Sequence, residues 1–301
     1  MSAEADVDRC QGFTITARNA RGRLVRLGPV LDQVMAAHAY PPVLEKLLAE
    51  ALVLTALLGA TLKDDGGQMT LQAQTQGGAV DLLVCDYRGG ELRGYVKHDP
   101  DRLAEIPADP SLFALFGNGY LAITFDQSVS GERYQGIVPL EGGSLAEAAE
   151  RYFDQSEQIP SLVRIATGGG SGAPCVAGGM LIQHLAEGEA GGERLHARDG
   201  HRHWEHVEAL AGTVSPDELI DPALPFETLI WRLFNEEDEV LLLDGGALAK
   251  GCRCNPEHIA DVIGRFPAEE RADMADADGI VHVDCAFCSR VFPIRLEAVP
   301  E

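Results

Sequence analysis

The sequence has few basic residues, and this shortage excludes one broad class of function. Its 301 residues include 24 Lys and Arg against 47 Asp and Glu, a formal net charge of −23 at pH 7. Proteins whose main partner is nucleic acid present basic surfaces to the phosphate backbone. We therefore expect no DNA or RNA partner, and we expect the negative charge to favour solubility.

Long apolar segments are also missing. The longest apolar run covers residues 51–60, whereas a helix needs roughly 20 apolar residues to cross a bilayer. The acidic start, MSAEADVDRC, lacks the apolar core of a signal peptide. We therefore expect a cytoplasmic protein with no membrane partner. In a reducing cytoplasm the seven cysteines should not form a permanent disulfide framework, so any clustered ones are expected to bind metal or to carry redox chemistry.

Catalytic patterns are absent as well. The glycine-rich stretch 168–172 lacks the Lys-Ser/Thr ending of a phosphate-binding loop. No Ser-His-Asp or paired-carboxylate pattern supports hydrolase chemistry. We expect a protein that is not an enzyme.

The pattern of apolar residues and turn signals predicts an α+β fold. Alternation and glycine turns indicate a β-hairpin over 10–27 and a meander of three strands between 68 and 97, and helical spacing indicates a largely buried helix over 42–62. Further strands are expected near 120–126, 134–140, 161–167, 175–183 and 240–243, and further helices over 29–38, 144–155, 204–210 and 226–234. Ser144 is expected to cap its helix, with Glu147 completing a capping box. We divide the chain into an α+β core domain with a mixed sheet (1–180), a helical or flexible linker (181–239) and a small C-terminal zinc-binding domain (240–301).

Four cysteines in the acidic tail carry the strongest chemical signal. Cys252-x-Cys254 and Cys285-x-x-Cys288 are separated by 30 residues, and two such pairs supply the four thiolates of a tetrahedral zinc site. The second pair is predicted at the turn of a hairpin, and Asn255-Pro256 is predicted to begin a helix after the first. Residues 236–301 carry 15 acidic and 6 basic residues, a net charge of −9, and a unit this small needs a metal to fold stably.

The spacing leaves the role of this zinc site open. Closed four-cysteine sites are usually structural, as in a zinc-ribbon interaction module. Each pair can also close into its own disulfide, which would remove ligands and unfold the tail. A third possibility is a thiol-disulfide oxidoreductase that uses Cys285 and Cys288.

Together with three other segments, the cysteine pattern resembles the 33 kDa heat-shock protein (chaperonin) family of redox-regulated holdase chaperones. These segments are YFDQSEQIP at 152–160, AGGMLIQ at 177–183 and LIWRLFNEE at 229–237. The likeness covers essentially the whole chain. The sequence departs from the family pattern at Gly251 and Asn255, where the family has an aromatic residue and a serine.

The resemblance implies a mechanism. The reduced, zinc-bound form is inactive, and oxidation joins Cys252 to Cys254 and Cys285 to Cys288. Zinc is then released, the tail and linker lose structure, and the protein forms a homodimer that holds unfolding client proteins without ATP. Apolar surface exposed in this way binds other apolar chains.

Other residues have weaker signals. We expect His196, His201, His203 and His206 to lie in a solvated loop rather than in a second metal site, and His258 and His282 to lie beside the zinc ligands rather than to replace one. Cys85 is expected in the core, and Cys10 and Cys175 have no partner at metal spacing. Trp231, Leu233 and Phe234 are expected to pack in the core at rest and to become available to clients once the linker opens.

Overall fold

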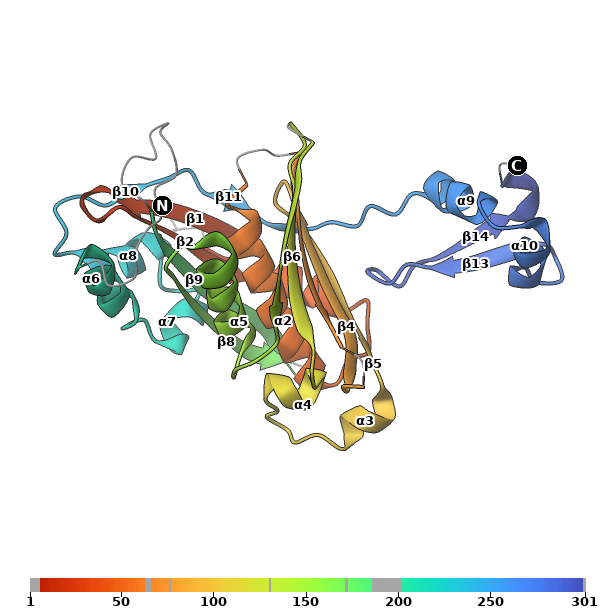
Figure 1. Cartoon of the computed structure of the whole chain (residues 1–301), viewed down its shortest axis with the longest axis horizontal. Coiled ribbons are helices and arrows are strands. Elements are labelled where there is room, and N and C mark those ends of the chain that lie inside the picture. Colours follow the sequence, from red (N-terminus) through yellow and green to blue (C-terminus); the bar gives the residue numbers. More distant parts are fainter. Residues whose placement is uncertain are drawn as a thin grey trace.

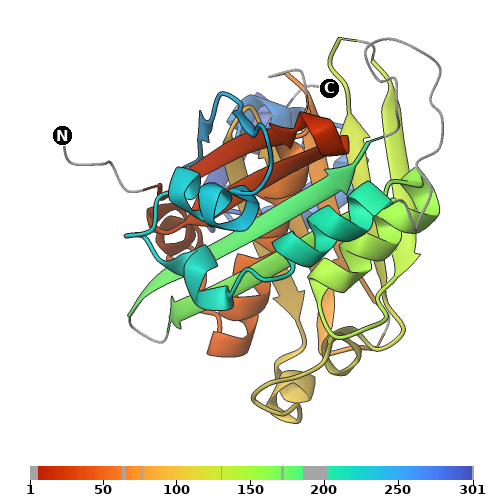
Figure 2. The same ribbon diagram turned by 90° about the vertical axis from the view of Figure 1, so that its left-hand side faces the viewer.

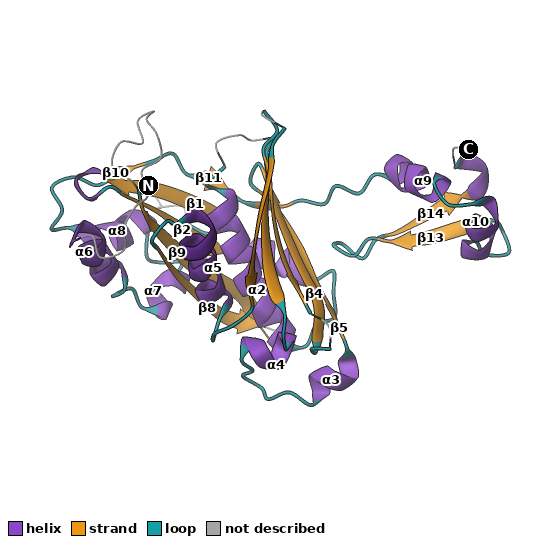
Figure 3. Ribbon diagram, in the orientation of Figure 1, coloured by secondary structure: helices purple, strands orange, loops and turns teal. Residues whose placement is uncertain are grey.

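The chain is described by a computed structural model over residues 6–62, 66–75, 77–129, 131–170, 173–185 and 202–299. The predicted α+β fold is confirmed (Figure 3). In the body of the molecule one long helix lies between two sheets, and a second group of helices covers the outer face of the first sheet (Figures 1 and 2). A small unit built from the last residues projects beyond the second sheet (Figure 1).

The first sheet, called sheet A here, contains the predicted hairpin. Its strand order is β10–β1–β2–β9–β8, and β11 also pairs with β1. The hairpin turn passes through Asn19, whose φ of 51° lies in the left-handed region that asparagine tolerates. The strands are β1 (Arg9–Ile15), β2 (Ala20–Leu27), β8 (Ser161–Gly170), β9 (Ala173–His184), β10 (Leu241–Leu242) and β11 (Gly246–Ala247).

The second sheet, sheet B, contains the predicted meander. Its order is β12–β5–β4–β3–β6–β7, and all its pairs are antiparallel except β12 with β5. Gly89 and Gly90, with φ of 54° and 85°, make the tight turn between β4 and β5. The strands are β3 (Gln68–Gln74), β4 (Val80–Arg88), β5 (Glu91–His98), β6 (Tyr120–Asp126), β7 (Arg133–Pro139) and β12 (Ala249–Lys250).

Helix α2 (Pro42–Gly59) forms the centre of the main core. It packs against β4 and β5 on one side and against β8 and β9 on the other, so 13 of its 18 residues are buried. Pro42 stands at its first turn, as predicted. None of the helices in the described parts of the chain is long and apolar enough to cross a bilayer.

Shorter helices complete the body. They are α1 (Pro29–Met35), α3 (Pro100–Ala104), α4 (Leu112–Phe116) and α5 (Leu145–Tyr152), the last continuing into a π-helical turn over Phe153–Glu157. Ser144 caps α5 as predicted, accepting a hydrogen bond from the Glu147 N–H. The Glu147 carboxylate accepts from the Gly143 N–H instead of the Ser144 N–H, so the predicted capping box is not complete. The structure has a full capping box at Ser215 and Glu218.

The helices of the predicted linker cover sheet A. They are α6 (Arg202–Ala211), α7 (Pro216–Ile220) and α8 (Phe226–Phe234), and they share a second apolar core with β1, β2, β8 and β9 (Figure 2). Leu233 and Phe234 are buried there as expected. The expectation for Trp231 is wrong, because the residue is 69% exposed. At about 100° per residue, Trp231 lies well away from the buried face set by Phe226 and Ile230.

Residues 241–250 run across both sheets before the tail begins. β10 and β11 pair with β1 in sheet A, and β12 then pairs with β5 in sheet B. The tail that follows consists of α9 (Pro256–Gly264), α10 (Ala268–Met274), β13 (Ile280–Asp284) and β14 (Val291–Arg295). Its own core is small, with five buried residues, namely Ile263, Val281, Phe292, Ile294 and Val299. We call residues 252–299 the thiol unit; the domain boundaries given above stay a prediction.

Candidate metal centre

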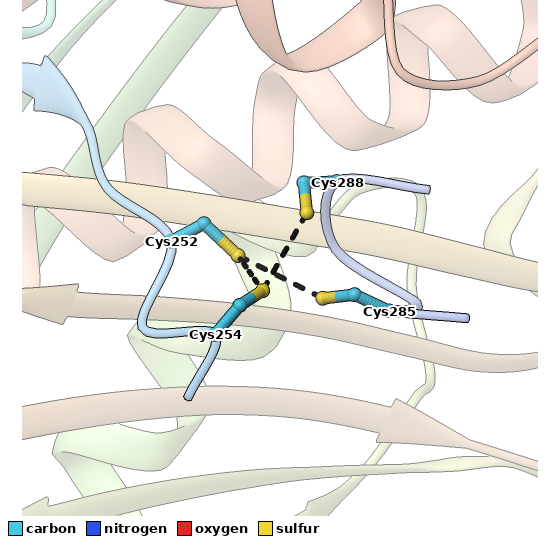
Figure 4. Close-up of side chains that lie close together, drawn as sticks. All are labelled: Cys252, Cys254, Cys285 and Cys288. Carbon is cyan, nitrogen blue, oxygen red and sulfur yellow. Dashed lines mark hydrogen bonds between the residues drawn. The ribbon is translucent and has the colours of Figure 1, made fainter. Parts of the chain in front are cut away.

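The four predicted ligands come together at the start of the thiol unit (Figure 4). The Sγ atoms of Cys252 and Cys254 are 3.0 Å apart, those of Cys252 and Cys285 3.7 Å, and those of Cys254 and Cys288 3.5 Å. All four sulfur atoms lie within 4.8 Å of one another. Among the described residues this is the one group of three or more potential metal ligands that lies so close together.

The first pair is held between a strand and a helix. The Gly251 N–H donates to the Leu92 carbonyl oxygen, which fixes the chain to β5 immediately before Cys252. After Cys254, Asn255 begins α9 by accepting hydrogen bonds from the N–H groups of Glu257 and His258, as the Asn-Pro sequence predicts. A Cβ atom on Gly251 would lie 2.5 Å from the Glu91 Cβ, so a larger residue at this position would require Glu91 or the main chain to move.

The second pair lies in the turn between β13 and β14, as predicted. The Cys285 N–H donates to the Arg290 carbonyl oxygen, and the Ser289 N–H donates to the Cys285 carbonyl oxygen. Ser289 adopts a φ of 54°, in the left-handed region. This tight turn directs both thiols of the pair towards Cys252 and Cys254 (Figure 4).

The spacing of the sulfur atoms fits a tetrahedral metal. With Zn–S bonds of roughly 2.3 Å, neighbouring sulfurs in a tetrahedral site are roughly 3.8 Å apart. The Sγ separations of 3.7 and 3.5 Å are close to this value, and the 3.0 Å pair is within about 1 Å of it. The four thiols could therefore hold a metal ion with small movements of their side chains.

The thiols differ in acidity. Burial raises the pKa of Cys252 and Cys254. Burial would also raise the pKa of Cys285, but hydrogen bonds from Cys254 and from the main chain at Cys288 and Phe287 outweigh it and lower this pKa to about 7. The turn thus stabilises a thiolate at Cys285, the form in which cysteine binds metals and attacks oxidants.

The histidines near the cysteines do not join the cluster. The His282 Nε2 atom lies 2.9 Å from the Asp276 carboxylate, and His258 is exposed on α9. The expectation of a solvated loop is wrong for His203 and His206, which lie on α6, where His206 pairs with Glu237 at 2.7 Å. His196 and His201 lie outside the described residues.

The other three cysteines lie apart from the cluster. Cys85 is fully buried in the main core, as predicted, and burial raises its pKa. Cys10 is also buried, and its pKa is raised to about 11. Cys175 is half-buried beside Asp32. None of the three thiols is poised to bind a metal with the others.

Two residues beside the ligands were missed by sequence reasoning. Arg253, between the first two cysteines, and Phe287, just before the last, both contact sheet B. No local sequence pattern predicts these contacts, because their partners lie more than 180 residues earlier in the chain.

The chain is similar over most of its length to proteins of one family. The family model described as Hsp33 protein matches residues 8–295. The chain is 44% identical to the 33 kDa chaperonin of Caulobacter vibrioides over 294 residues, covering 95% of this chain and 94% of that protein. It is 38% identical to the 33 kDa chaperonin of Cronobacter sakazakii, covering 94% and 91%. The crystal structure of the 33 kDa chaperonin from Thermotoga maritima has a similar fold, with a TM-score of 0.78 at 22% identity over 97% of this chain and 96% of that one.

Proposed function

The chain belongs to the Hsp33 family of chaperones, and from that premise we propose that it is an ATP-independent holdase controlled by the oxidation of Cys252, Cys254, Cys285 and Cys288. One observation carries the proposal: the four thiols converge where the thiol unit joins the body. A change at these thiols therefore acts on the joint between the two parts of the chain.

In the reduced protein we propose that the four thiolates hold one Zn²⁺ ion. When bound, the ion keeps the thiolates deprotonated and cross-links two segments that are 30 residues apart. Five buried residues give the thiol unit too little apolar core to fold stably without such a cross-link. The acidity of Cys285 and the sulfur spacing support this assignment.

Oxidation is proposed to open the site. Two thiolates of one pair give two electrons to a hydroperoxide, so that its O–O bond breaks and an S–S bond forms. Two protons from solvent complete the products, which are water and an alcohol, or two waters when the oxidant is hydrogen peroxide. The pairs are Cys252 with Cys254 and Cys285 with Cys288. Because a disulfide brings its sulfurs to about 2.0 Å, the thiolates release the ion and the thiol unit loses its cross-link.

The loss of the thiol unit is proposed to expose apolar surface for clients. Residues 241–250 connect the helices that cover sheet A to the thiol unit. Unfolding of the thiol unit therefore removes the anchor that follows the predicted linker. The surface that opens is the apolar core shared by α6–α8 and sheet A, and unfolding proteins would bind it. We also propose a cytoplasmic protein that forms a homodimer on activation, with a core domain over 1–180, a linker over 181–239 and a redox domain over 240–301.

One experiment tests the function. Zinc-loaded protein is treated with hydrogen peroxide at mildly raised temperature, while zinc release and the aggregation of a chemically denatured test protein are followed. We expect zinc release and suppression of aggregation to appear together. The matched control is Cys175→Ser, a change at a half-buried cysteine outside the cluster, which should behave like the unchanged protein.

Two results would contradict the proposal. Oxidised protein that keeps its zinc would favour a constitutive structural site in an interaction module. Catalytic turnover of disulfides in added substrates, without protection of the client, would favour a thiol-disulfide oxidoreductase.

A further inference from the structure

Each cysteine pair carries one side chain that reaches sheet B. Between Cys252 and Cys254, the Arg253 guanidinium donates a hydrogen bond to the Gln68 side-chain oxygen on β3. Arg253 is partly buried, and this burial lowers its pKa. The first pair is thereby attached to the body through a residue that is not itself a ligand.

The second pair is attached through Phe287. Its ring lies beneath the Arg93 guanidinium, whose Cζ atom is 4.0 Å from the ring centre. The Tyr95 and Phe287 rings form an edge-to-face pair, with ring centres 4.9 Å apart and planes at 88°. Figure 1 shows the turn between β13 and β14 pointing at this sheet. A cation over a ring and an edge-to-face ring pair are both attractive geometries.

The two contacts are connected by one polar row on the outer face of sheet B. Thr70, Asp86 and Arg93 are neighbouring partners on β3, β4 and β5. The Asp86 carboxylate, 3% exposed as a residue, accepts from the Thr70 hydroxyl at 2.7 Å and pairs with Arg93 at 2.6 Å. Gln68 donates to the Thr70 hydroxyl oxygen at 3.1 Å, which joins the Arg253 contact to the same row.

We propose that Arg253 and Phe287 are the positioning residues that hold the thiol unit on sheet B, and that each disulfide releases one of these two contacts. This rests on the proposed function, because it assumes that both pairs are oxidised. Neighbouring sulfurs in a tetrahedral site are roughly 3.8 Å apart and those of a disulfide about 2.0 Å. Closing a pair therefore pulls its two cysteines together and moves the side chain that lies between them.

The amide of Gly251 reports on docking without involving the metal. It donates to the Leu92 carbonyl oxygen on β5, one residue before the first cysteine. Undocking of the thiol unit frees this end of β12, so the amide exchanges with solvent more often. Hydrogen–deuterium exchange at Gly251, measured by NMR on the reduced, zinc-loaded full chain, is the readout, together with zinc content and free thiols.

The test compares Phe287→Ala and Arg253→Ala with matched controls. Phe266→Ala and Arg265→Ala remove the same side-chain types from exposed positions in the thiol unit. We expect exchange at Gly251 to rise about tenfold in the two test variants and to stay unchanged in the two controls. Zinc content and reduced thiols should equal those of the unchanged protein, and oxidation of the unchanged protein should raise the exchange as well.

A substitution inside the thiol unit could disturb the metal site directly. A variant of the body separates this effect from loss of the docking contact. Tyr95 is on β5, outside the thiol unit. The variant Tyr95→Ala should therefore keep its full zinc content and show the same faster exchange at Gly251 as Phe287→Ala. Exchange within a factor of about two of the unchanged protein in Tyr95→Ala or Arg253→Ala would overturn the proposal. Loss of zinc from Phe287→Ala with normal exchange in Tyr95→Ala would also overturn it. If oxidised protein fails to protect a client while these exchange results hold, the docking contact stands and the proposed chaperone function fails.

Discussion

The main chain at Gly178 lies directly against the carbonyl group of Leu219: a Cβ atom added to Gly178 would be 2.1 Å from that oxygen. Gly178 is on β9, and Leu219 is on α7, in the predicted linker. The next residue, Gly179, faces the other way, where an added Cβ would be 2.5 Å from a methyl carbon of Val53 on α2. The paired glycines thus allow close packing on both faces of sheet A.

Replacing Gly178 with alanine should loosen the linker. The added carbon meets main-chain atoms that cannot rotate away, so α7 must move, at a cost of about 1–3 kcal/mol in the free energy of unfolding. Urea unfolding measures the loss, and binding of an apolar fluorescent dye to the reduced protein should rise. Gly246→Ala is the control, because nothing lies within 4 Å of its added carbon. Equal stability of the two variants would contradict this account of α7 packing.

Arg26 should be essential for the same packing. It is the β-sheet partner of Gly178, is fully buried, and donates to the carbonyl oxygens of Leu219, Leu224 and Glu218 at 3.0–3.2 Å. Arg26→Met keeps much of the volume but leaves these oxygens without donors. Since each unsatisfied buried group costs about 1–3 kcal/mol, we expect the free energy of unfolding, measured by thermal denaturation, to fall by about 3 kcal/mol.

The exposed Arg88 provides the comparison for Arg26. Arg88→Met should change the free energy of unfolding by less than about 0.5 kcal/mol. A similar small effect of Arg26→Met would show that water replaces the lost donors and that the linker does not depend on this side chain.

Protonation of Glu237 should make the protein less stable in acid. Its side chain is 2% exposed; burial alone would raise its pKa, but hydrogen bonds from Arg18 at 2.8 Å and His206 at 2.7 Å outweigh burial and lower it. A carboxyl group with a lowered folded-state pKa stabilises the protein above its unfolded-state pKa of about 4.3, and this contribution is lost as pH falls through the folded-state value.

The measurement for Glu237 is the free energy of unfolding between pH 7 and pH 3. Glu237→Gln should lower it by about 1.5–3 kcal/mol at pH 7, and the difference from the unchanged protein should shrink as the pH falls below about 4. Glu236→Gln, at the exposed neighbouring position, should have little effect at any pH. A difference that stays constant down to pH 3 would mean that the charge of Glu237 contributes nothing.

Cys285→Ser should weaken metal binding and loosen the thiol unit without unfolding residues 1–180. The main core around α2 has no residue in common with the small core of the thiol unit, so the body should keep its structure. We expect a fall in bound zinc, faster hydrogen exchange over residues 256–299, and unchanged exchange in α2, β3 and β4. A variant that unfolds throughout would contradict the division of the chain into separately stabilised parts.

Much of the secondary structure was predictable because it depends on neighbours in the sequence. Alternating apolar residues, glycine turns and the Asn255-Pro256 cap identified the hairpin, the meander and the start of α9. The error at Trp231 was avoidable, because the helical spacing of Phe226, Ile230 and Phe234 already places Trp231 off the buried face. The helix over 268–274 was missed for lack of a clear apolar face, since none of its residues is buried.

The sequence by itself determined the candidate metal centre, because four cysteines in two closely spaced pairs could hold a metal ion wherever the chain brings them together. It also determined the family, through segments that span nearly the whole chain. Only the tertiary structure decided that residues 241–250 join both sheets, that Gly178 meets Leu219, and that Arg253 and Phe287 reach sheet B. These contacts join residues that are distant in the sequence, and local patterns carry no information about which distant surface a side chain will meet.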